Sequence, residues 1–126
     1  MYVLDSGAIT MLAERSTRAA AILAVLRVED EWPPVVPSAV LVECLIGKPD
    51  LDARTNQFLK TCDVEPRLAE GQARRAAKLR TAAGRGSAVD AIVVAMAEPG
   101  GTVVTGDTAD ISALAANAIG VETLTI

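Results

Sequence analysis

Two short stretches decide the fold: residues 2–7, YVLDSG, and residues 102–107, TVVTGD. Each begins as a brief apolar run and stops at polar residues and a glycine, which is typical of a buried strand that ends in a turn. Alanine-rich segments with apolar residues at helical spacing fill much of the rest of the chain. Short apolar strands that alternate with helices predict an α/β fold, a single-domain parallel-sheet sandwich with helices on both faces.

The bounds of the other elements are predicted from proline, glycine and capping residues. Two prolines after Trp32 end a helix, and the pattern Ser87-x-x-Asp90 predicts a capping box at the start of another. Ser38 is the expected N-cap of a helix that closes at Gly47. The predicted helices cover residues 8–14, 17–29, 38–47, 50–60, 67–84, 87–98 and 110–117, and the predicted strands cover residues 2–4, 35–36, 102–104 and 121–126.

Length and composition narrow the function. At 126 residues and 13.1 kDa, the chain is expected to form one domain, residues 1–126. Half of it (51%) is apolar, but no apolar run reaches the roughly 20 residues of a membrane span, so we expect no membrane association. The absence of histidine excludes imidazole-based nucleophiles and histidine zinc sites. A net charge of −4 argues against non-specific coating of nucleic acid.

Cysteine usage and the first residues indicate a reducing compartment. Cys44 and Cys62 form neither a CxxC pair nor another metal-binding spacing, and we interpret them as buried or half-buried thiols. The first residues lack the basic segment and the long apolar segment of a signal peptide. We therefore expect a cytoplasmic location.

Five carboxylates stand out by their positions. Asp5 and Asp107 follow the two strand-forming runs, with Asp110 close behind, and the carboxyl ends of parallel strands should bring them into one crevice. Glu43 and Asp90 are the isolated charges of two apolar segments, where a carboxylate is expected to be buried or to face a cavity. Each aspartate also fits a helix cap, and Glu43 fits a buried ion pair with an arginine, so these structural interpretations stay open.

Together these acids predict a site for a hard divalent cation. Carboxylates without histidine or cysteine are the ligands that Mg²⁺ or Mn²⁺ prefers, and not those of zinc or copper. Clustered carboxylates also need a cation if all of them are to stay ionised. Such a site suits phosphodiester hydrolysis, in which metal ions activate a water and neutralise the leaving oxyanion.

The same residues, in the same order, resemble the PIN-domain family. The pattern comprises Val-Leu-Asp5-Ser6, then Glu43 in an apolar segment, then Asp90 at the head of an apolar helix, then Thr105-Gly-Asp107-Thr-Ala-Asp110. In length and order, and over essentially the whole chain, it is most similar to the VapC-type ribonuclease toxins of bacterial toxin–antitoxin pairs. The resemblance implies an endoribonuclease that uses Mg²⁺ or Mn²⁺, is usually a homodimer and is silenced by a small VapB-like antitoxin protein.

The resemblance also implies roles for individual residues, carried over position by position. The implied catalytic acids are Asp5, Glu43, Asp90 and Asp107, and Ser6 and Thr105 match the hydroxyl positions that support them. The implied metal ligands are Asp5, Asp90, Asp107 and Asp110. Which of Asp107 and Asp110 is the main fourth acid stays open.

A basic segment precedes Asp90 and is a candidate for contacts with an RNA substrate. No acid occurs between Glu70 and Asp90, whereas Arg74, Lys78 and Arg85 lie there at helical spacing and predict a stripe that contacts RNA phosphates. The alternative is an ordinary solvated helix face. The alanine-rich helices predicted within residues 8–29 and 39–46 are an expected groove for an antitoxin helix.

Two other functional classes compete with the nuclease. A phosphoacceptor receiver domain would need an aspartate after the second strand and a lysine after a late one, but Pro37-Ser38 and Asp107 stand there. A non-catalytic interaction module, whose acids are only caps and ion pairs, should be indifferent to EDTA and to Asp5→Asn. A metal-dependent nuclease should respond to both.

Overall fold

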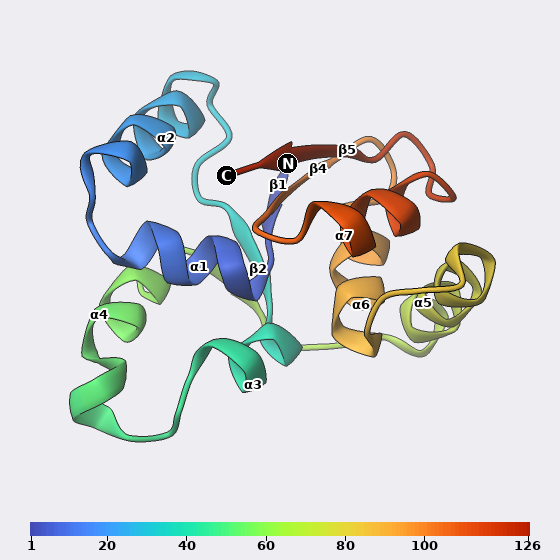
Figure 1. Ribbon diagram of the computed structural model, residues 1–126, viewed down its shortest axis with the longest axis horizontal. Coiled ribbons are helices and arrows are strands. Elements are labelled where there is room, and N and C mark those ends of the chain that lie inside the picture. The colour runs from blue at the N-terminus through green and yellow to red at the C-terminus, as the bar shows by residue number, and fades with distance from the viewer.

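The sheet has five strands, all parallel, in the spatial order β3-β2-β1-β4-β5 (Figure 1). The computed structural model describes residues 1–126. Its strands are β1 (Tyr2–Leu4), β2 (Val35–Pro37), β3 (Asp63–Glu65), β4 (Thr102–Thr105) and β5 (Glu122–Thr125). Val3 of the central strand pairs with Val35 on one side and Val103 on the other, which fixes the register of the two apolar runs.

Seven α-helices cover the sheet in two layers. They are α1 (Ser6–Ala13), α2 (Thr17–Val28), α3 (Leu41–Cys44), α4 (Pro49–Leu59), α5 (Glu70–Ala83), α6 (Ala88–Ala97) and α7 (Thr108–Ala115), with a 3₁₀ helix, η1, at Ser38–Val40. Figure 1 shows α1, α2 and α4 on one side of the sheet and α5, α6 and α7 on the other. The predicted α/β class, with a parallel sheet and helices on both faces, is confirmed.

The strand order places a topological switch point between β1 and β4. From β1 the chain moves through β2 to β3 in one direction across the sheet, and from β4 to β5 it moves in the other. In open parallel sheets, a crevice forms outside the carboxyl ends of the strands where the direction reverses, and ligands bind there. The order also differs from the order 2-1-3-4-5 of flavodoxin-like folds, which include receiver domains, so the receiver alternative is excluded.

The core explains why the two apolar runs and helix α6 form these elements. Val3, Leu4, Val103 and Val104 are completely buried, as expected for central parallel strands that are covered on both faces. Helix α6 is apolar on nearly all sides because it lies between the sheet and α5. The apolar side chains on the two faces of the sheet belong to one continuous buried cluster. The turns that follow β1 and β4 therefore project from a well-packed core.

The structure corrects three predicted elements. The helix predicted at 38–47 is broken into η1 and the single-turn helix α3, and Ser38 begins η1 without capping it. Strand β3 lies where no strand was predicted, because its sequence Asp63-Val64-Glu65 has only one apolar residue and its pairing with β2 makes it a strand. Helix α5 begins at Glu70 rather than at residue 67.

Two further findings bear on the environment of the protein. No helix has the length and apolar character needed to cross a membrane. Cys44 and Cys62 are half-buried and form no disulfide.

Candidate metal centre

Three helices begin at the switch point, and an aspartate caps each of them. Asp5 is the N-cap of α1 and accepts a hydrogen bond from the Ala8 amide at 2.8 Å, and Asp107 is the N-cap of α7. Asp90 completes the predicted capping box of α6, since its carboxylate accepts from the Ser87 amide at 3.1 Å while the Ser87 hydroxyl accepts from the Asp90 amide at 3.0 Å. The helix-cap interpretation is therefore correct for these three residues, and it also explains why they meet.

Asp90, Asp107 and Asp110 form an acidic cluster that could hold a metal ion. Each contributes one carboxylate oxygen, and these oxygens all lie within 4.8 Å of one another. The cap of α6 uses one carboxylate oxygen of Asp90, and the cap of α7 uses Oδ1 of Asp107, which accepts from the Asp110 amide at 3.2 Å. The second oxygen of each carboxylate accepts no hydrogen bond from the protein and is available to a cation.

Asp5 lies beside this acidic cluster but is not part of it. Its side chain is buried, and both oxygens are engaged: Oδ1 by the Ala8 amide and Oδ2 by the hydroxyl of Thr105. Burial raises the pKa of the Asp5 carboxyl and the negative charge of Asp90 adds to the rise, while the hydrogen bonds oppose it. The hydrogen bonds fix the orientation of the carboxylate at the end of β1.

The two predicted hydroxyl residues differ in their roles. Thr105, at the end of β4, is fully buried; its hydroxyl donates to Asp5 and accepts from the Asp107 amide at 2.8 Å. It therefore ties the end of β1 to the turn that presents Asp107. Ser6 is the first residue of α1 and is half-buried, and its hydroxyl takes no part in the bonds that fix Asp5.

Glu43 does not lie where the sequence predicted it. It was expected to be buried in an apolar helix, but it is exposed on the four-residue helix α3 and is outside the acidic cluster. The reason is that its apolar neighbours Val42 and Ile46 are themselves largely exposed, at 82% and 67%, so this segment has no apolar environment to bury a carboxylate in. A buried ion pair with an arginine is likewise absent.

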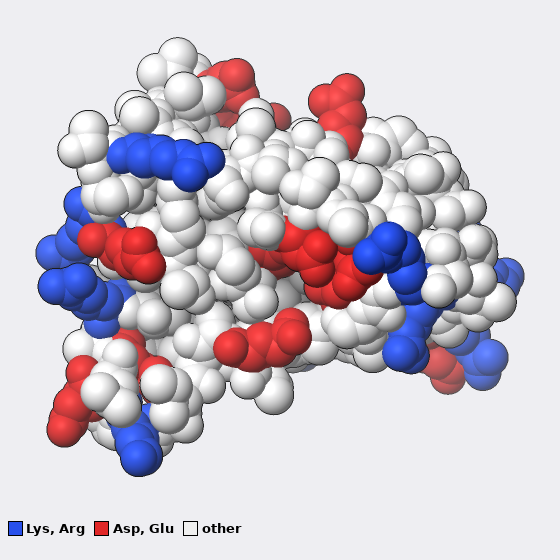
Figure 2. All heavy atoms as spheres, viewed as in Figure 1, with Lys and Arg blue, Asp and Glu red and all other residues white.

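The positive charges around the acidic cluster offset only part of its negative charge. Arg85 forms an ion pair with Asp110, with 2.6 Å between Nε and Oδ1. The starts of α1, α6 and α7 each add about half a positive charge. Four carboxylates, counting Asp5, exceed this positive charge, so the site attracts a cation. Figure 2 shows acidic side chains gathered where these helices begin, with basic side chains beside them toward α5.

The basic residues expected to contact RNA do not form one stripe. Arg74 is paired with Glu70 at 3.0 Å, Lys78 is exposed on α5, and Arg85 lies beyond the end of that helix at Gly84. Because the helix ends between Lys78 and Arg85, helical spacing does not relate them. Of the three, only Arg85 is bonded to a member of the acidic cluster.

Two glycines allow the turns at the site to approach each other, a role beyond the turn signal that they give in the sequence. A Cβ on Gly7 would lie 3.3 Å from the Cα of Gly106, so a side chain there would push apart the turns after β1 and β4. The signal was present in the sequence, since each apolar run ends in a glycine. What the sequence lacked was the pairing of β1 with β4 that places the two glycines face to face.

Asp52 also has a structural role that no pattern in the sequence indicated. It is buried on α4, and its carboxylate accepts from the amides of Ile46 and Gly47 at 2.8 to 3.2 Å. These bonds hold the turn between α3 and α4 and lower the pKa of the Asp52 carboxyl. Asp52 thereby determines where the short helix that carries Glu43 ends.

Comparison with known proteins adds no assignment to this geometry. A scan against protein-family models matched no family, and a search of curated proteins matched none.

Proposed function

We propose that this protein is a metal-dependent endoribonuclease of the PIN-domain type, the toxin of a VapBC-like toxin–antitoxin pair. One observation carries the proposal: three carboxylate oxygens, from Asp90, Asp107 and Asp110, lie within 4.8 Å of one another at the switch point of a parallel sheet. The buried Asp5 lies beside them. The ordered set of acids, from which the family resemblance was inferred, supports the choice of reaction.

The acidic residues would have distinct roles in this reaction. Asp90 and Asp107 would hold Mg²⁺ or Mn²⁺ through the oxygens that the helix caps leave free, and Asp110 through the oxygen that Arg85 does not engage, since hard cations prefer oxygen ligands. When bound, the cation supplies Lewis acidity, which lowers the pKa of a water and neutralises charge on the leaving oxygen. Asp5, held by Thr105 and the start of α1, would orient the group bound next to it or complete the ligand set.

Proton transfer in this reaction depends on carboxylates, because the chain has no histidine. Glu43 is exposed and forms no ion pair, and it lies on helix α3, which packs against α1. We propose that it accepts the proton of the attacking water or orients that water. Ser6 would add a hydroxyl at the start of α1. Arg85, with Lys78 and Arg74 further along α5, would contact the RNA backbone, which positions a strand without reading its sequence.

RNA cleavage by the purified protein tests this proposal. A mixed RNA pool is incubated with the wild type in Mg²⁺, in Mn²⁺ and in EDTA, beside Asp90→Asn and the matched control Asp63→Asn. Asp63 is an exposed acid on β3, an edge strand that lies two strands away from β1. Its substitution therefore removes the same charge without touching the acidic cluster. We expect discrete products that need metal, disappear in Asp90→Asn and persist in Asp63→Asn.

This experiment also distinguishes the nuclease from the alternative, a non-catalytic interaction module. Asn retains an acceptor for the capping box, so Asp90→Asn should fold. A folded wild type that cleaves no RNA under any of these conditions, and whose stability is unchanged by metal, would favour a module whose acids serve only as caps and ion pairs.

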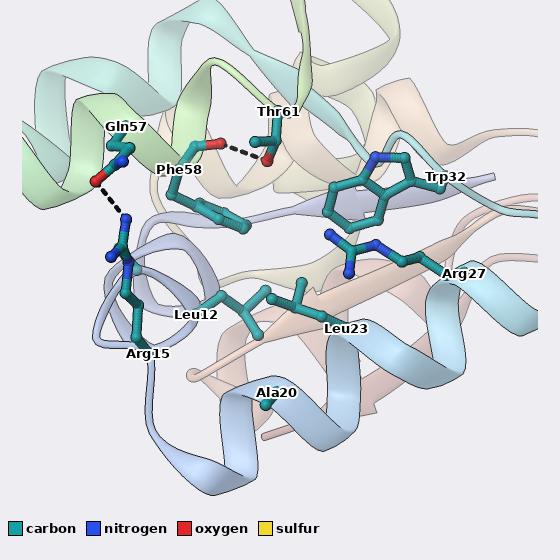
Figure 3. Close-up of a pocket in the computed structure, with 10 residues that line it drawn as sticks. Leu12, Arg15, Ala20, Leu23, Arg27, Trp32, Gln57, Phe58 and Thr61 are labelled. Atoms are coloured by element: carbon teal, nitrogen blue, oxygen red, sulfur yellow. Dashed lines mark hydrogen bonds between the residues drawn. The ribbon is translucent and has the colours of Figure 1, made fainter.

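An apolar cavity supports the proposed antitoxin partner. It has a volume of about 310 Å³ and lies between α1, α2 and α4, with Leu12, Leu23 and Phe58 exposing carbon atoms to it (Figure 3). Arg27 lies over the Trp32 ring at 4.6 Å at one side. An amphipathic antitoxin helix could insert an apolar side chain here. The segment 39–46, expected to share in this groove, does not line the cavity.

Substitution in the cavity separates partner binding from catalysis. Leu23→Glu introduces a charge into the cavity, far from the acidic cluster in sequence and on the opposite side of the sheet from α6. We expect this variant to cleave RNA as the wild type does and to escape inhibition by the antitoxin. Equal inhibition of both proteins would place the antitoxin elsewhere.

We further propose a homodimer in the cytoplasm. Val42, Ile46 and Leu51 expose apolar side chains on neighbouring parts of α3, its turn and α4, with 65% to 82% of each side chain accessible. A second copy of the chain would cover them. Light scattering of the wild type and Val42→Glu measures the molar mass, and a monomeric wild type would overturn the dimer.

A further inference from the structure

A polar cavity lies beside the acidic cluster, at the loop that joins α5 to α6. It has a volume of about 380 Å³, and no hydrophobic or acidic side chain lines it. Its lining consists of two guanidinium groups, one hydroxyl and glycine backbone, from Arg80, Thr81, Gly84, Arg85 and Gly86. Arg80 belongs to the basic segment between Glu70 and Asp90 but not to the predicted stripe of Arg74, Lys78 and Arg85.

Both arginines are held in the same manner, with the terminal nitrogens left free. The Nε of Arg80 donates to the Gly86 carbonyl at 3.1 Å, and the Nε of Arg85 donates to Asp110 at 2.6 Å. The terminal NH₂ groups of both side chains make no hydrogen bond to the protein. A guanidinium fork matches two oxygens of a phosphate group, and such charge-assisted bonds are stronger than neutral ones.

Two glycines shape the loop that follows α5 and carries Arg85. Gly84 and Gly86 have φ values of +67° and +97°, a region that favours glycine. A Cβ on Gly86 would lie 2.8 Å from Cδ1 of the buried Leu114, on α7. The backbone conformation therefore favours glycine at residue 86, and a Cβ there would have to displace the end of the Leu114 side chain.

The charge of the cavity favours an anion. Two contributions oppose it: the carboxyl end of α5, which carries about half a negative charge, and the Asp110 carboxylate that is bonded to Arg85. The two guanidinium groups still outweigh their sum. Because Arg85 is bonded to Asp110, an anion in this cavity would lie immediately next to the acidic cluster.

We propose that this cavity binds a non-cleaved phosphate of the RNA backbone, adjacent along the strand to the phosphate at the acidic cluster. The inference rests on the proposed nuclease function and names how its substrate is held. Arg85 links the two sites, Arg80 binds the phosphate from the other side, and Thr81 adds a hydroxyl donor. A free phosphate ion has the same chemistry, and the test distinguishes it from RNA.

The test measures binding of a short fluorescein-labelled single-stranded RNA of mixed sequence by anisotropy over a range of salt concentrations. Every protein carries Asp90→Asn, because the proposed nuclease should then bind the RNA without cleaving it. To this background we add Arg80→Gln, Thr81→Val or the control Arg54→Gln. Arg54 is exposed on α4, on the other side of the sheet, and its substitution changes the net charge equally. Inorganic phosphate is titrated against the same proteins by calorimetry.

We expect Arg80→Gln to weaken RNA binding about tenfold, because it removes charge-assisted hydrogen bonds. The slope of log affinity against log salt should fall by about 0.7, the value for one phosphate contact on a single strand. Thr81→Val, which leaves both guanidinium groups in place, should weaken binding about fivefold. Loosening of the loop alone would not change the salt slope in this way.

Two outcomes would overturn the proposal. Equal RNA affinity and salt slope for Arg80→Gln and Arg54→Gln would show that the cavity holds no backbone phosphate, while RNA cleavage by the protein without Asp90→Asn would leave the nuclease function intact. Binding of inorganic phosphate that Arg80→Gln weakens, without any binding or cleavage of RNA, would make the cavity a free-anion site and contradict the nuclease as well.

Discussion

Replacing Asp107 by Asn should separate the structural role of this residue from its role toward a metal. Two competing electrostatic effects act in the metal-free protein. At the 4.8 Å that bounds the oxygen separations in the acidic cluster, two unit charges repel by about 0.9 kcal/mol in bulk water. Screening over a Debye length of about 8 Å reduces this to about 0.5 kcal/mol. Asp107 faces two such partners, so removing its charge relieves about 1 kcal/mol.

The opposing effect is the loss of a negative charge at the start of α7, which costs about 0.3 to 1 kcal/mol. Asn caps a helix about as well as Asp, so the hydrogen bond to the Asp110 amide should persist. The two effects nearly cancel. For a chain of 126 residues, 1 kcal/mol corresponds to about 4 °C in Tm. In EDTA, Asp107→Asn should therefore melt within about 3 °C of the wild type.

Added metal should separate the two proteins. A ligand that binds only the folded state at a concentration of about one hundred times its Kd stabilises that state by about 2.7 kcal/mol. This corresponds to a rise of about 10 °C in the Tm of the wild type. Asp107→Asn lacks one of the three carboxylates of the acidic cluster and should show a much smaller rise. Differential scanning calorimetry in EDTA, Mg²⁺ and Mn²⁺ measures both quantities.

Two control variants complete this experiment. Asp107→Ala also removes the cap and should melt about 4 °C below Asp107→Asn in EDTA. Asp63→Asn should respond to metal as the wild type does. The reasoning is refuted if metal raises the Tm of Asp107→Asn and of the wild type equally, or if Asp107→Asn is strongly destabilised in EDTA.

Three further predictions concern individual side chains. Thr105→Val removes the buried hydroxyl that donates to Asp5, and the missing donor should lower the free energy of unfolding, measured in urea, by about 1 to 3 kcal/mol; an unchanged value would contradict this. The pKa of Asp52 is lowered, so its carboxylate stabilises the fold above its unfolded pKa of about 3.9, and this contribution is lost as pH falls through the lower folded pKa. Asp52→Asn should therefore melt below the wild type at neutral pH, and thermal melts should converge in strong acid; a constant difference would refute the assignment. Burial raises the pKa of the Cys62 thiol to about 11, so iodoacetamide should modify it far more slowly near neutral pH than it modifies a free cysteine, with mass spectrometry as the readout; equal rates would contradict its burial.

The sequence was sufficient to predict the elements whose signals lie within a few neighbouring residues. The capping box at Ser87 and Asp90 is complete within four residues, and the structure contains it as predicted. Val3, Leu4, Val103 and Val104 are fully buried, and the short length and apolar composition of the two runs that contain them indicate central parallel strands. The position of Asp5 and Asp107 just after the two strands then places both acids at the same edge of the parallel sheet.

The errors concern residues whose surroundings come from distant parts of the chain. Glu43 was expected to be buried because its neighbours are apolar, but no other element covers Val42 and Ile46 in this chain. Strand β3 exists because β2 pairs with it. The ion pair between Arg85 and Asp110 joins residues 25 positions apart, which helical spacing does not predict. Burial and pairing are tertiary properties, and a local pattern indicates them only where it is strongly periodic.

The helix-cap and metal-ligand interpretations of the aspartates are compatible, and the geometry explains why. A carboxylate has two oxygens and a cap uses only one of them. Asp90 and Asp107 can therefore each cap the start of a helix and still present an oxygen to the crevice. Capping also holds the side chains in place before any cation arrives, which lowers the entropy lost on binding. Asp5 shows the limit of this arrangement: the Thr105 hydroxyl engages its second oxygen, and Asp5 is outside the acidic cluster. The free second oxygens of Asp90 and Asp107 are therefore the first candidates to bind a cation, and Asp5 would orient the bound group or complete the ligand set.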